Sequence, residues 1–427
     1  MEVLVEPATP AVRFWKGPHA WLAEQRLQPE FWRFFAAAFF FDAGFAVYFF
    51  LFNLYLLDVG FDERTMGMVG GALTLGSVVG TLPAGALTRR FGVRRLLMVC
   101  FVAAPLVGAV RAVWMWRPAQ IGCAFVAGVA MCLWGVCFLP AVARLTEDRN
   151  RASGFGLIFS ASVGTSAVGG LVCGYLPHWL QRAGVAMSAA EVKRGILLGS
   201  CGIALLGLVA LRRLRVPEVE EVLEQRADNR WMVRWRPHGL ALRLVPLIAL
   251  WAAIQAAFTP FAMVHLTRDF RIPLTQVGLL FSVAQLLQLG TGLATPVLFR
   301  MLGLVRGIVV TQLATAMALG MMAVVHEGRA AVALYLCFAA AQWMSSPGMY
   351  NLLMSETPDA ERGSVAAVAM FCNALVSAGA TWIAGVMLMR VGYPVVMVST
   401  ALSALAVAMV FGVSVTGRVR GRRSVER

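Results

Sequence analysis

The sequence predicts an all-α integral membrane protein with twelve transmembrane helices, arranged as two pseudo-symmetric halves of six helices each. Apolar residues make up 59% of the 427 residues and charged residues only 14%, against about 25% in a soluble domain. The mean hydropathy is +0.74. Long apolar runs recur along the chain, and loop residues of the first half return in the second half at a constant spacing. Together these observations predict a duplicated membrane bundle.

Apolar runs of about 20 residues, enough for a helix to cross a hydrocarbon layer about 30 Å thick, can be marked twelve times. We place them at 34–58, 66–88, 96–115, 121–143, 154–179, 195–211, 244–266, 276–299, 307–325, 330–354, 365–389 and 394–415. Pro260 and the pair Pro347 and Gly348 mark positions where the seventh and tenth helices can bend, because proline removes a helical hydrogen bond.

The duplication is visible as a constant offset of 211 residues, the difference between Arg300 and Arg89. At this offset the loops of the two halves match: Arg89, Gly92 and Arg95 with Arg300, Gly303 and Arg306, and Thr146, Asp148, Arg151 and Ser153 with Thr357, Asp359, Arg362 and Ser364. Asp58 matches Asp269, Gly67 matches Gly278 and Gly174 matches Gly385. A repeat of this length in an apolar chain is typical of a transporter whose substrate site lies between the halves.

The repeat divides the chain into five segments. They are an interfacial N-terminal segment (1–31), a first six-helix half (32–211), a linker with one short helix (212–243), a second half (244–415) and a basic tail (416–427). Most Lys and Arg residues fall on the side of both termini, which places that side in the cytoplasm. We expect a multi-pass protein of the bacterial inner (plasma) membrane with both termini cytoplasmic.

Several classes of function are disfavoured by the polar residues. The formal charge of +15 is spread over short loops and forms no single basic face, which disfavours nucleic acid as a partner. The eight cysteines lie inside predicted spans without a CxxC pair, and the five histidines are scattered, so we predict neither a disulfide framework nor a metal site. No paired acid and base is apparent, and we expect no catalytic residues, no enzyme activity and no bound cofactor.

The loop after the second span, Gly85-Ala-Leu-Thr-Arg89-Arg90-Phe-Gly92-Val-Arg94-Arg95, resembles the signature of the major facilitator superfamily. The segment 296–306 and the loops 146–153 and 357–363 are similar to the matching positions of that family. The resemblance spans essentially the whole chain and implies two halves that rock about a midplane site. Arg89 stands where the family usually has an acid, the helix 4 arginine of proton-coupled drug antiporters is missing, and the helix 5 glycine pattern of antiporters is only approximate.

The duplicated loops carry opposite charges in the two halves and predict a cytoplasmic gate. Arginines of the first loop can face acids after the tenth span, and Arg300 and Arg306 can face acids after the fourth. Each exposed pair contributes roughly 0–1 kcal/mol. The alternative is that these charges only anchor the loops and set the topology. The predicted gate residues are Gly85, Arg89, Arg90, Gly92, Arg94, Arg95, Glu147, Asp148, Arg151, Arg300, Arg306, Glu356, Asp359, Glu361 and Arg362.

Asp42 is the sharpest candidate for coupling. It lies roughly 12 Å into the first span, where an ionised carboxylate costs about 2.5–3.5 kcal/mol. An acid at this depth can carry a proton, bind a cationic substrate, or do both in competition. The alternative is a structural acid that caps a neighbouring helix or pairs with an arginine. We expect Arg111, near the outer end of the third span, to reach the surface.

The resemblance implies that helices 1, 2, 4, 5, 7, 8, 10 and 11 line the cavity, and these helices carry most of the buried polar side chains. For serine and threonine the alternative is a hydrogen bond to their own helix backbone. The predicted cavity residues are Phe49, Asn53, Gln255, Thr259, Gln285, Gln288, Gln342, Trp343, Ser346, Tyr350, Asn373 and Ser377. One acid among amides and aromatic rings suits a neutral or cationic amphiphile better than a phosphate or dicarboxylate, which would need cationic clamps.

We therefore predict a secondary active transporter that exports a small neutral or cationic molecule by proton-coupled antiport, driven by protons or another ion gradient. A proton-coupled or passive importer of a polar metabolite is the first alternative, and a non-transporting membrane sensor or lipid scramblase is the second. The lipid bilayer and a small-molecule substrate are the expected partners, and we expect a monomer.

Overall fold

The computed structural model describes residues 27–147, 150–184, 187–214, 241–357 and 362–425, and within these ranges it contains helices and no strand. The first half holds α2 (Pro29–Asp58), α3 (Glu63–Phe91), α4 (Val93–Val113), α5 (Arg117–Leu145), α6 (Arg151–Arg182) and α7 (Ala189–Arg212). The second half holds α9 (Ala241–Phe258), the 3-10 helix η2 (Thr259–Phe261), α10 (Ala262–Arg268), α11 (Leu274–Leu302), α12 (Leu304–Met322), α13 (Gly328–Ser355) and α14 (Arg362–Val425). Residues 1–26 of the predicted surface segment (1–31) and residues 215–240 of the predicted linker (212–243) lie outside the described residues.

Nine helices of the described part are long and apolar enough to cross a membrane. One of them, 368–414, is two helical arms that meet at Gly392, where φ is 80° and ψ is 173°. Two more helices, α3 and α13, have 29 and 28 residues. This set is consistent with the twelve predicted spans, and it confirms the all-helical membrane fold. The last arm of α14 remains helical past 415, where the last predicted span ends.

The seventh predicted span is broken as its proline suggests. α9 ends at Phe258, the 3-10 helix η2 contains Pro260, and α10 continues to Arg268. Proline has no N–H for the helical ladder, so the chain uses a tighter turn there. α13 behaves differently, because it runs without interruption through Pro347.

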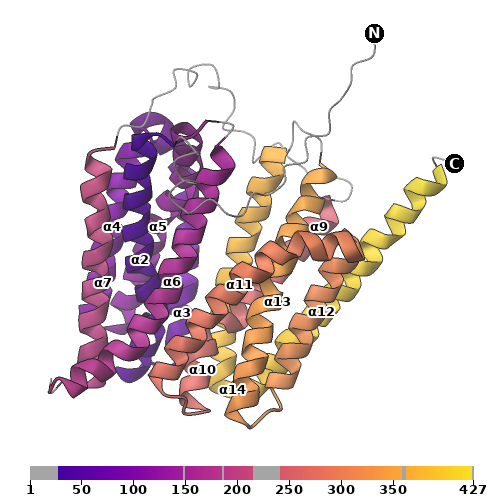
Figure 1. Cartoon of the computed structure of the whole chain (residues 1–427). Helices are drawn as coiled ribbons and strands as arrows, with labels where there is room; N and C mark the ends of the chain where they lie inside the picture. Colours follow the sequence, from indigo (N-terminus) through magenta and orange to yellow (C-terminus); the bar gives the residue numbers. More distant parts are fainter. Residues whose placement is uncertain (1–26, 148–149, 185–186, 215–240, 358–361, 426–427) are drawn as a thin grey trace, which may run out of the picture.

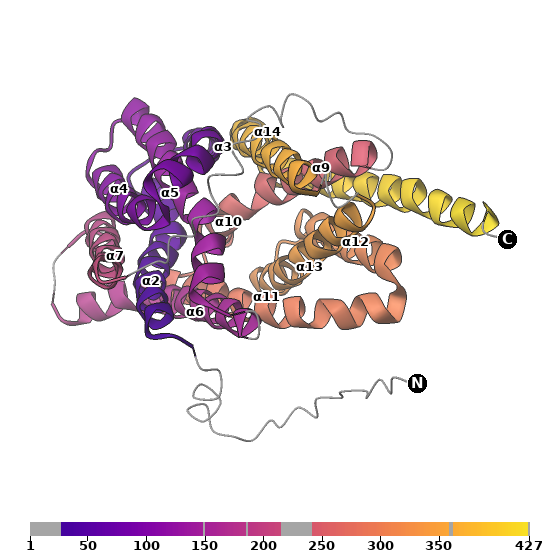
Figure 2. The same ribbon diagram turned by 90° about the horizontal axis from the view of Figure 1, so that it is seen from above.

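The two halves are built alike. In the first half α2 packs on α7, α3 on α5, and α4 on both α5 and α7. In the second half α9 packs on α14, α11 on α13, and α12 on both α13 and α14, which is the same set of contacts shifted by the repeat. Figure 2 shows the halves side by side, with α2 to α7 in one group and α9 to α14 in the other. The core of the first half is aromatic: Phe41 stacks on Phe101 with ring centroids 4.2 Å apart, and Trp134 packs against both.

The bundle has two distinct ends. We call the end where α2 begins and α7 ends the termini end, and the end that carries the α2–α3 and α10–α11 turns the far end. The two turns α3–α4 and α11–α12 lie at the termini end and match in backbone conformation, since Gly92 has φ 79° and Gly303 has φ 80°. Such positive φ angles favour glycine, which explains why glycine recurs at this point of the repeat.

The halves meet through two seams, α3 against α14 and α6 against α11. Gly67 packs on Gly385 in the first seam, and Gly278 packs on Gly174 in the second. A Cβ on Gly278 would lie 2.3 Å from the carbonyl oxygen of Gly170, so the two helix backbones are in direct contact. Figure 1 shows the two groups of helices meeting at the far end and diverging toward the termini end.

Candidate functional site

Asp42 lies in the middle of α2. At 1.5 Å per residue it is about 20 Å from the first residue of the helix and about 24 Å from the last. The carboxylate is half-buried and lies close to the Ser162 hydroxyl of α6. Among the described residues no lysine, arginine or histidine forms an ion pair with it. The alternative that Asp42 is neutralised by an arginine therefore has no support in the described part of the chain.

The stripe of α2 that holds Asp42 reaches the second half at Asn53. Positions 42, 49 and 53 fall on one helix face, and Asn53 Nδ2 donates to the carbonyl oxygen of Pro260 at 2.9 Å. Phe49 lies between them with 47% of its surface exposed. Next to this stripe, Phe50 contacts Phe281 of α11, with ring centroids 4.7 Å apart. The sequence correctly placed these residues on one face, but it did not show that Asn53 contributes to the contact between halves.

Three of the predicted cavity residues form one hydrogen-bonded cluster inside the second half. Gln255 Nε2 donates to the backbone carbonyl of Gln342 at 2.8 Å, and the Thr259 hydroxyl donates to Gln342 Oε1 at 3.1 Å. Gln342 is only 1% exposed. The break after Phe258 positions this cluster, because Thr259 opens the 3-10 helix and lies beside α13. The cluster ties α9 and η2 to α13 in this conformation.

A second pair joins α13 to α14. Asn373 Nδ2 donates to the Tyr350 hydroxyl, and the buried Asn373 Oδ1 has no hydrogen-bond partner among the described residues. An unpaired buried carbonyl oxygen is costly, so it is a candidate to accept a hydrogen bond from a ligand or from water. Neither this pair nor the Gln342 cluster makes a hydrogen bond to Asp42 among the described residues.

The remaining predicted cavity residues vary in exposure. Trp343 is 48% exposed, and the other four residues are partly buried and make no hydrogen bond through their own side chains among the described contacts. These four are Gln285, Gln288, Ser346 and Ser377. The unpaired amides of α11 contrast with the Gln342 cluster, where each amide is already engaged. Gln285 and Gln288 therefore remain predicted cavity residues whose side-chain amides can bind a ligand.

The far end carries a contact between halves that the sequence did not reveal. Arg268 of α10 forms an ion pair with Glu63 of α3, and the Glu63 side chain is 3% exposed against 54% for Arg268. Beside the pair, His265 lies 2.6 Å from Asp269 and stacks on Tyr393 with ring centroids 4.4 Å apart. At the repeat offset Glu63 matches Leu274 and Arg268 matches Leu57, so the duplication gave no signal for this pair.

Arg111 is buried, which corrects the expectation that it reaches the surface. It is 3% exposed and lies over the ring of Phe52, with its guanidinium carbon 4.2 Å from the ring centroid. The cation is stabilised by the aromatic face and by packing in the first half, away from both seams. It therefore contributes to the core of the first half and adds no charge to the stripe that holds Asp42.

The predicted gate at the termini end is only partly covered by the structure. Asp148, Asp359 and Glu361 lie outside the described residues, and the side chains of Arg89 and Arg362 are likewise not described. Arg94 donates to the backbone carbonyl of Arg212 in its own half at 2.6 Å. In this conformation the contacts between halves lie toward the far end, and the gate pairs stay a prediction for a state closed at the termini end.

Comparison with known proteins agrees with this architecture. No curated protein sequence matches the chain. Among solved structures, the nucleoside transporter NupG superposes with a TM-score of 0.73 at 14% identity, covering 91% of this chain and 99% of NupG. A D-xylose-proton symporter gives 0.69 at 16% identity, covering 89% and 95%. A bacterial homolog of the human lysosomal transporter Spinster, inward-facing and unoccupied, gives 0.69 at 12% identity, covering 91% and 97%.

At these identities the superpositions show a shared fold. The sequence model of the Major Facilitator Superfamily matches residues 34–381, which is most of the chain. The duplicated halves, the two seams and this match lead to one conclusion: the protein belongs to the Major Facilitator Superfamily.

Proposed function

We propose that the protein is a proton-coupled exporter of a small neutral or cationic amphiphile, with Asp42 as the coupling acid. The observation that carries the proposal is the setting of Asp42, at mid-helix on the face that reaches the second half at Asn53, without a cationic partner among the described residues. Such a carboxylate can bind a proton or a cationic group of the substrate. Competition between the two couples substrate release to proton uptake.

Alternating access follows from the same arrangement. We infer that this conformation, in which the seams close the far end, exposes the face of α2 that holds Asp42 to the termini end. We place that end in the cytoplasm on the distribution of Lys and Arg, in a bacterial inner membrane. Substrate enters from this side, the halves rock, and the far end opens to release it. We assign no catalytic reaction and no cofactor, and we propose a monomer as the working unit.

Import of a polar metabolite is the second candidate. It is favoured by the unpaired amides Gln285 and Gln288 and by the carbonyl oxygen of Asn373, which suit a sugar or nucleoside. By their printed names, the structural relatives include a nucleoside transporter and a D-xylose-proton symporter. A membrane sensor or a lipid scramblase remains a third alternative, tested by lipid flip assays in vesicles.

Purified protein in liposomes with an imposed pH gradient distinguishes these functions. For proton antiport, tetraphenylphosphonium accumulates when the lumen is acidic, and Asp42→Asn abolishes the dependence on the gradient. For proton symport, uridine or xylose accumulates when the outside is acidic. Asp62→Asn is the matched control, since the change is chemically the same and asparagine is as good an N-cap for α3 as aspartate.

The assay has two outcomes that contradict the proposal. Gradient-driven uptake of the cation that survives in Asp42→Asn assigns Asp42 a structural role. Uptake of uridine or xylose alone, with an acidic exterior, replaces the exporter by the importer.

A further inference from the structure

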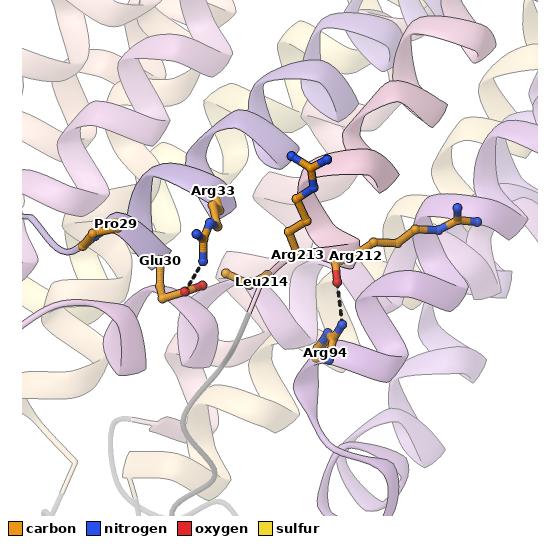
Figure 3. Close-up of a pocket in the computed structure, with 7 residues that line it drawn as sticks. All are labelled: Pro29, Glu30, Arg33, Arg94, Arg212, Arg213 and Leu214. Atoms are coloured by element: carbon orange, nitrogen blue, oxygen red, sulfur yellow. Dashed lines mark hydrogen bonds and ion pairs between the residues drawn. The ribbon is translucent and has the colours of Figure 1, made fainter.

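A pocket of about 820 Å³ lies at the termini end of the first half, away from the face of α2 that carries Asp42. Three helices contribute to it: the first turns of α2 and α4 and the last turn of α7. Figure 3 shows the residues that line it: Pro29, Glu30, Arg33, Arg94, Arg212, Arg213 and Leu214. Four of the seven are arginines, so the pocket is strongly basic.

Among the described residues, most of this positive charge has no acidic partner. Glu30 forms an ion pair with Arg33, and Arg94 donates to the backbone carbonyl of Arg212. Among the described residues no carboxylate pairs with Arg94, Arg212 or Arg213, and in Figure 3 the guanidinium groups of Arg212 and Arg213 extend away from the other labelled side chains. One acid against four arginines leaves a net charge of +3. Such a pocket is complementary to a multivalent anion.

The backbone adds to the attraction. α2 and α4 both begin at the pocket, and neither helix has a side-chain cap at its N-terminus. The positive dipole end of each helix favours a negative charge in front of it. The two helix ends thus add to the positive potential of the pocket that these arginines line.

The fold itself does not require this cluster. At the repeat offset, Arg33 matches Leu244 and Arg94 matches Val305 in the second half. The second half forms the same helices and the same contacts without these arginines. Placing positive charge on the cytoplasmic side also does not require that four arginines line one pocket. A bound anion would account for this cluster of arginines.

An exposed tryptophan indicates that the pocket lies near the lipid headgroups. Trp32, in the first turn of α2, is 37% exposed, and tryptophan is enriched at membrane interfaces. A second pocket of about 210 Å³ adjoins the first through Arg94 and is lined by Arg95 and Arg144 as well. Basic pockets between helix ends on the cytoplasmic side bind the headgroups of anionic lipids.

We propose that this pair of pockets binds the phosphates of an anionic phospholipid from the leaflet at the termini end. Two basic pockets that share Arg94 fit a lipid with two phosphates, so cardiolipin binds more tightly than phosphatidylglycerol. Phosphatidylcholine, whose headgroup has no net charge, does not occupy the site.

Native mass spectrometry of the purified full chain, titrated with each of the three lipids, measures the binding. We expect wild-type protein to prefer cardiolipin over phosphatidylglycerol and phosphatidylcholine. Arg212→Gln with Arg213→Gln weakens cardiolipin binding roughly twentyfold, because each surface arginine contributes roughly fivefold to anionic lipid binding. Arg212→Lys with Arg213→Lys restores much of the affinity. The matched control is Arg182→Gln with Arg194→Gln, which removes the same charge at the far end and keeps wild-type binding.

A second measurement uses wild-type protein, so that the test does not depend on whether a variant folds. Cardiolipin raises the thermal unfolding midpoint of wild-type protein, and 1 M salt abolishes the increase by screening the phosphate contacts. Equal binding of phosphatidylcholine, or equal loss of cardiolipin in both double variants, overturns the proposal. Inorganic phosphate that displaces cardiolipin at millimolar concentration identifies the pocket as a site for a soluble anion and overturns the lipid assignment.

Discussion

The two ends of the bundle differ in what the two halves present to each other. At the far end the halves meet through glycines, with Gly67 on Gly385 and Gly278 on Gly174, so closure depends on the fit of helix backbones. At the termini end the facing loops carry arginines and acids, so we propose that closure there depends on charge. Van der Waals packing is sensitive to shifts of a fraction of an ångström and is independent of salt. Exposed charges interact over about 10 Å and are screened by salt. The two gates of one cycle should therefore respond to different perturbations.

The largest effect is expected at the second glycine seam. Gly278→Ala places a Cβ 2.3 Å from the carbonyl oxygen of Gly170. Overpacking of this kind costs about 3 kcal/mol, and here both neighbours are backbone, so little can relax. The closed far end becomes roughly a hundredfold less populated. Hydrogen exchange of amides in 58–67 and 269–278 should rise, and transport should fall.

Gly290→Ala is the matched control for this variant. It makes the same change in the same helix α11, but a Cβ at Gly290 meets nothing within 4 Å. It should leave exchange at the far end unchanged and stabilise the helix slightly. If both variants behave alike, the seam is not what holds the far end closed.

The seams also show how far the sequence alone predicts this fold. The apolar runs predicted the helices, Pro260 predicted the break in the seventh span, and the repeat matched Gly67 with Gly278 and Gly174 with Gly385. The repeat did not show that the pairs cross between the halves, so that Gly67 packs on Gly385 while its equivalent Gly278 packs on Gly174, the equivalent of Gly385. That exchange is a property of the two-fold arrangement of the halves, which no local pattern encodes.

The candidate site was less predictable than the fold. The depth of Asp42 follows from counting residues along the span, but its contact with Ser162 depends on how α6 packs against α2. Gln255, Thr259 and Gln342 stood out as buried polar groups, and the structure brings them together as partners of one another. Spacing along a helix identifies a face, and it cannot show which polar groups satisfy each other across helices.

Breaking the ion pair at the far end is expected to cost less stability than Gly278→Ala. The cost should also depend on which of the two partners is replaced. Arg268→Gln leaves the buried Glu63 carboxylate without its partner, which costs about 2 kcal/mol. Glu63→Gln leaves Arg268, which is 54% exposed and keeps its hydration, so this change costs about 1 kcal/mol. Thermal unfolding and exchange at the far end should rank the variants in this order.

The double variant Glu63→Gln with Arg268→Gln is the control for the asymmetry. The double variant has no buried Glu63 carboxylate without a partner, so it should be more stable than Arg268→Gln alone. Equal destabilisation by both single variants would show that the contact is a solvated pair with no buried partner.

The smallest effect is expected at the termini end. Arg300→Gln with Arg306→Gln should change the free energy of unfolding by about 0.5 kcal/mol per site or less, because exposed charges contribute little. If these arginines pair with the acids of the first half only when the termini end closes, the double variant alters the transport rate in low salt. In 1 M salt, where the screening length is about 3 Å, variant and wild type should become alike. Gly278→Ala should be insensitive to the same salt, since its defect is one of shape. A rate change in the arginine variant that persists in high salt would contradict an electrostatic gate and would mean that these residues act by packing.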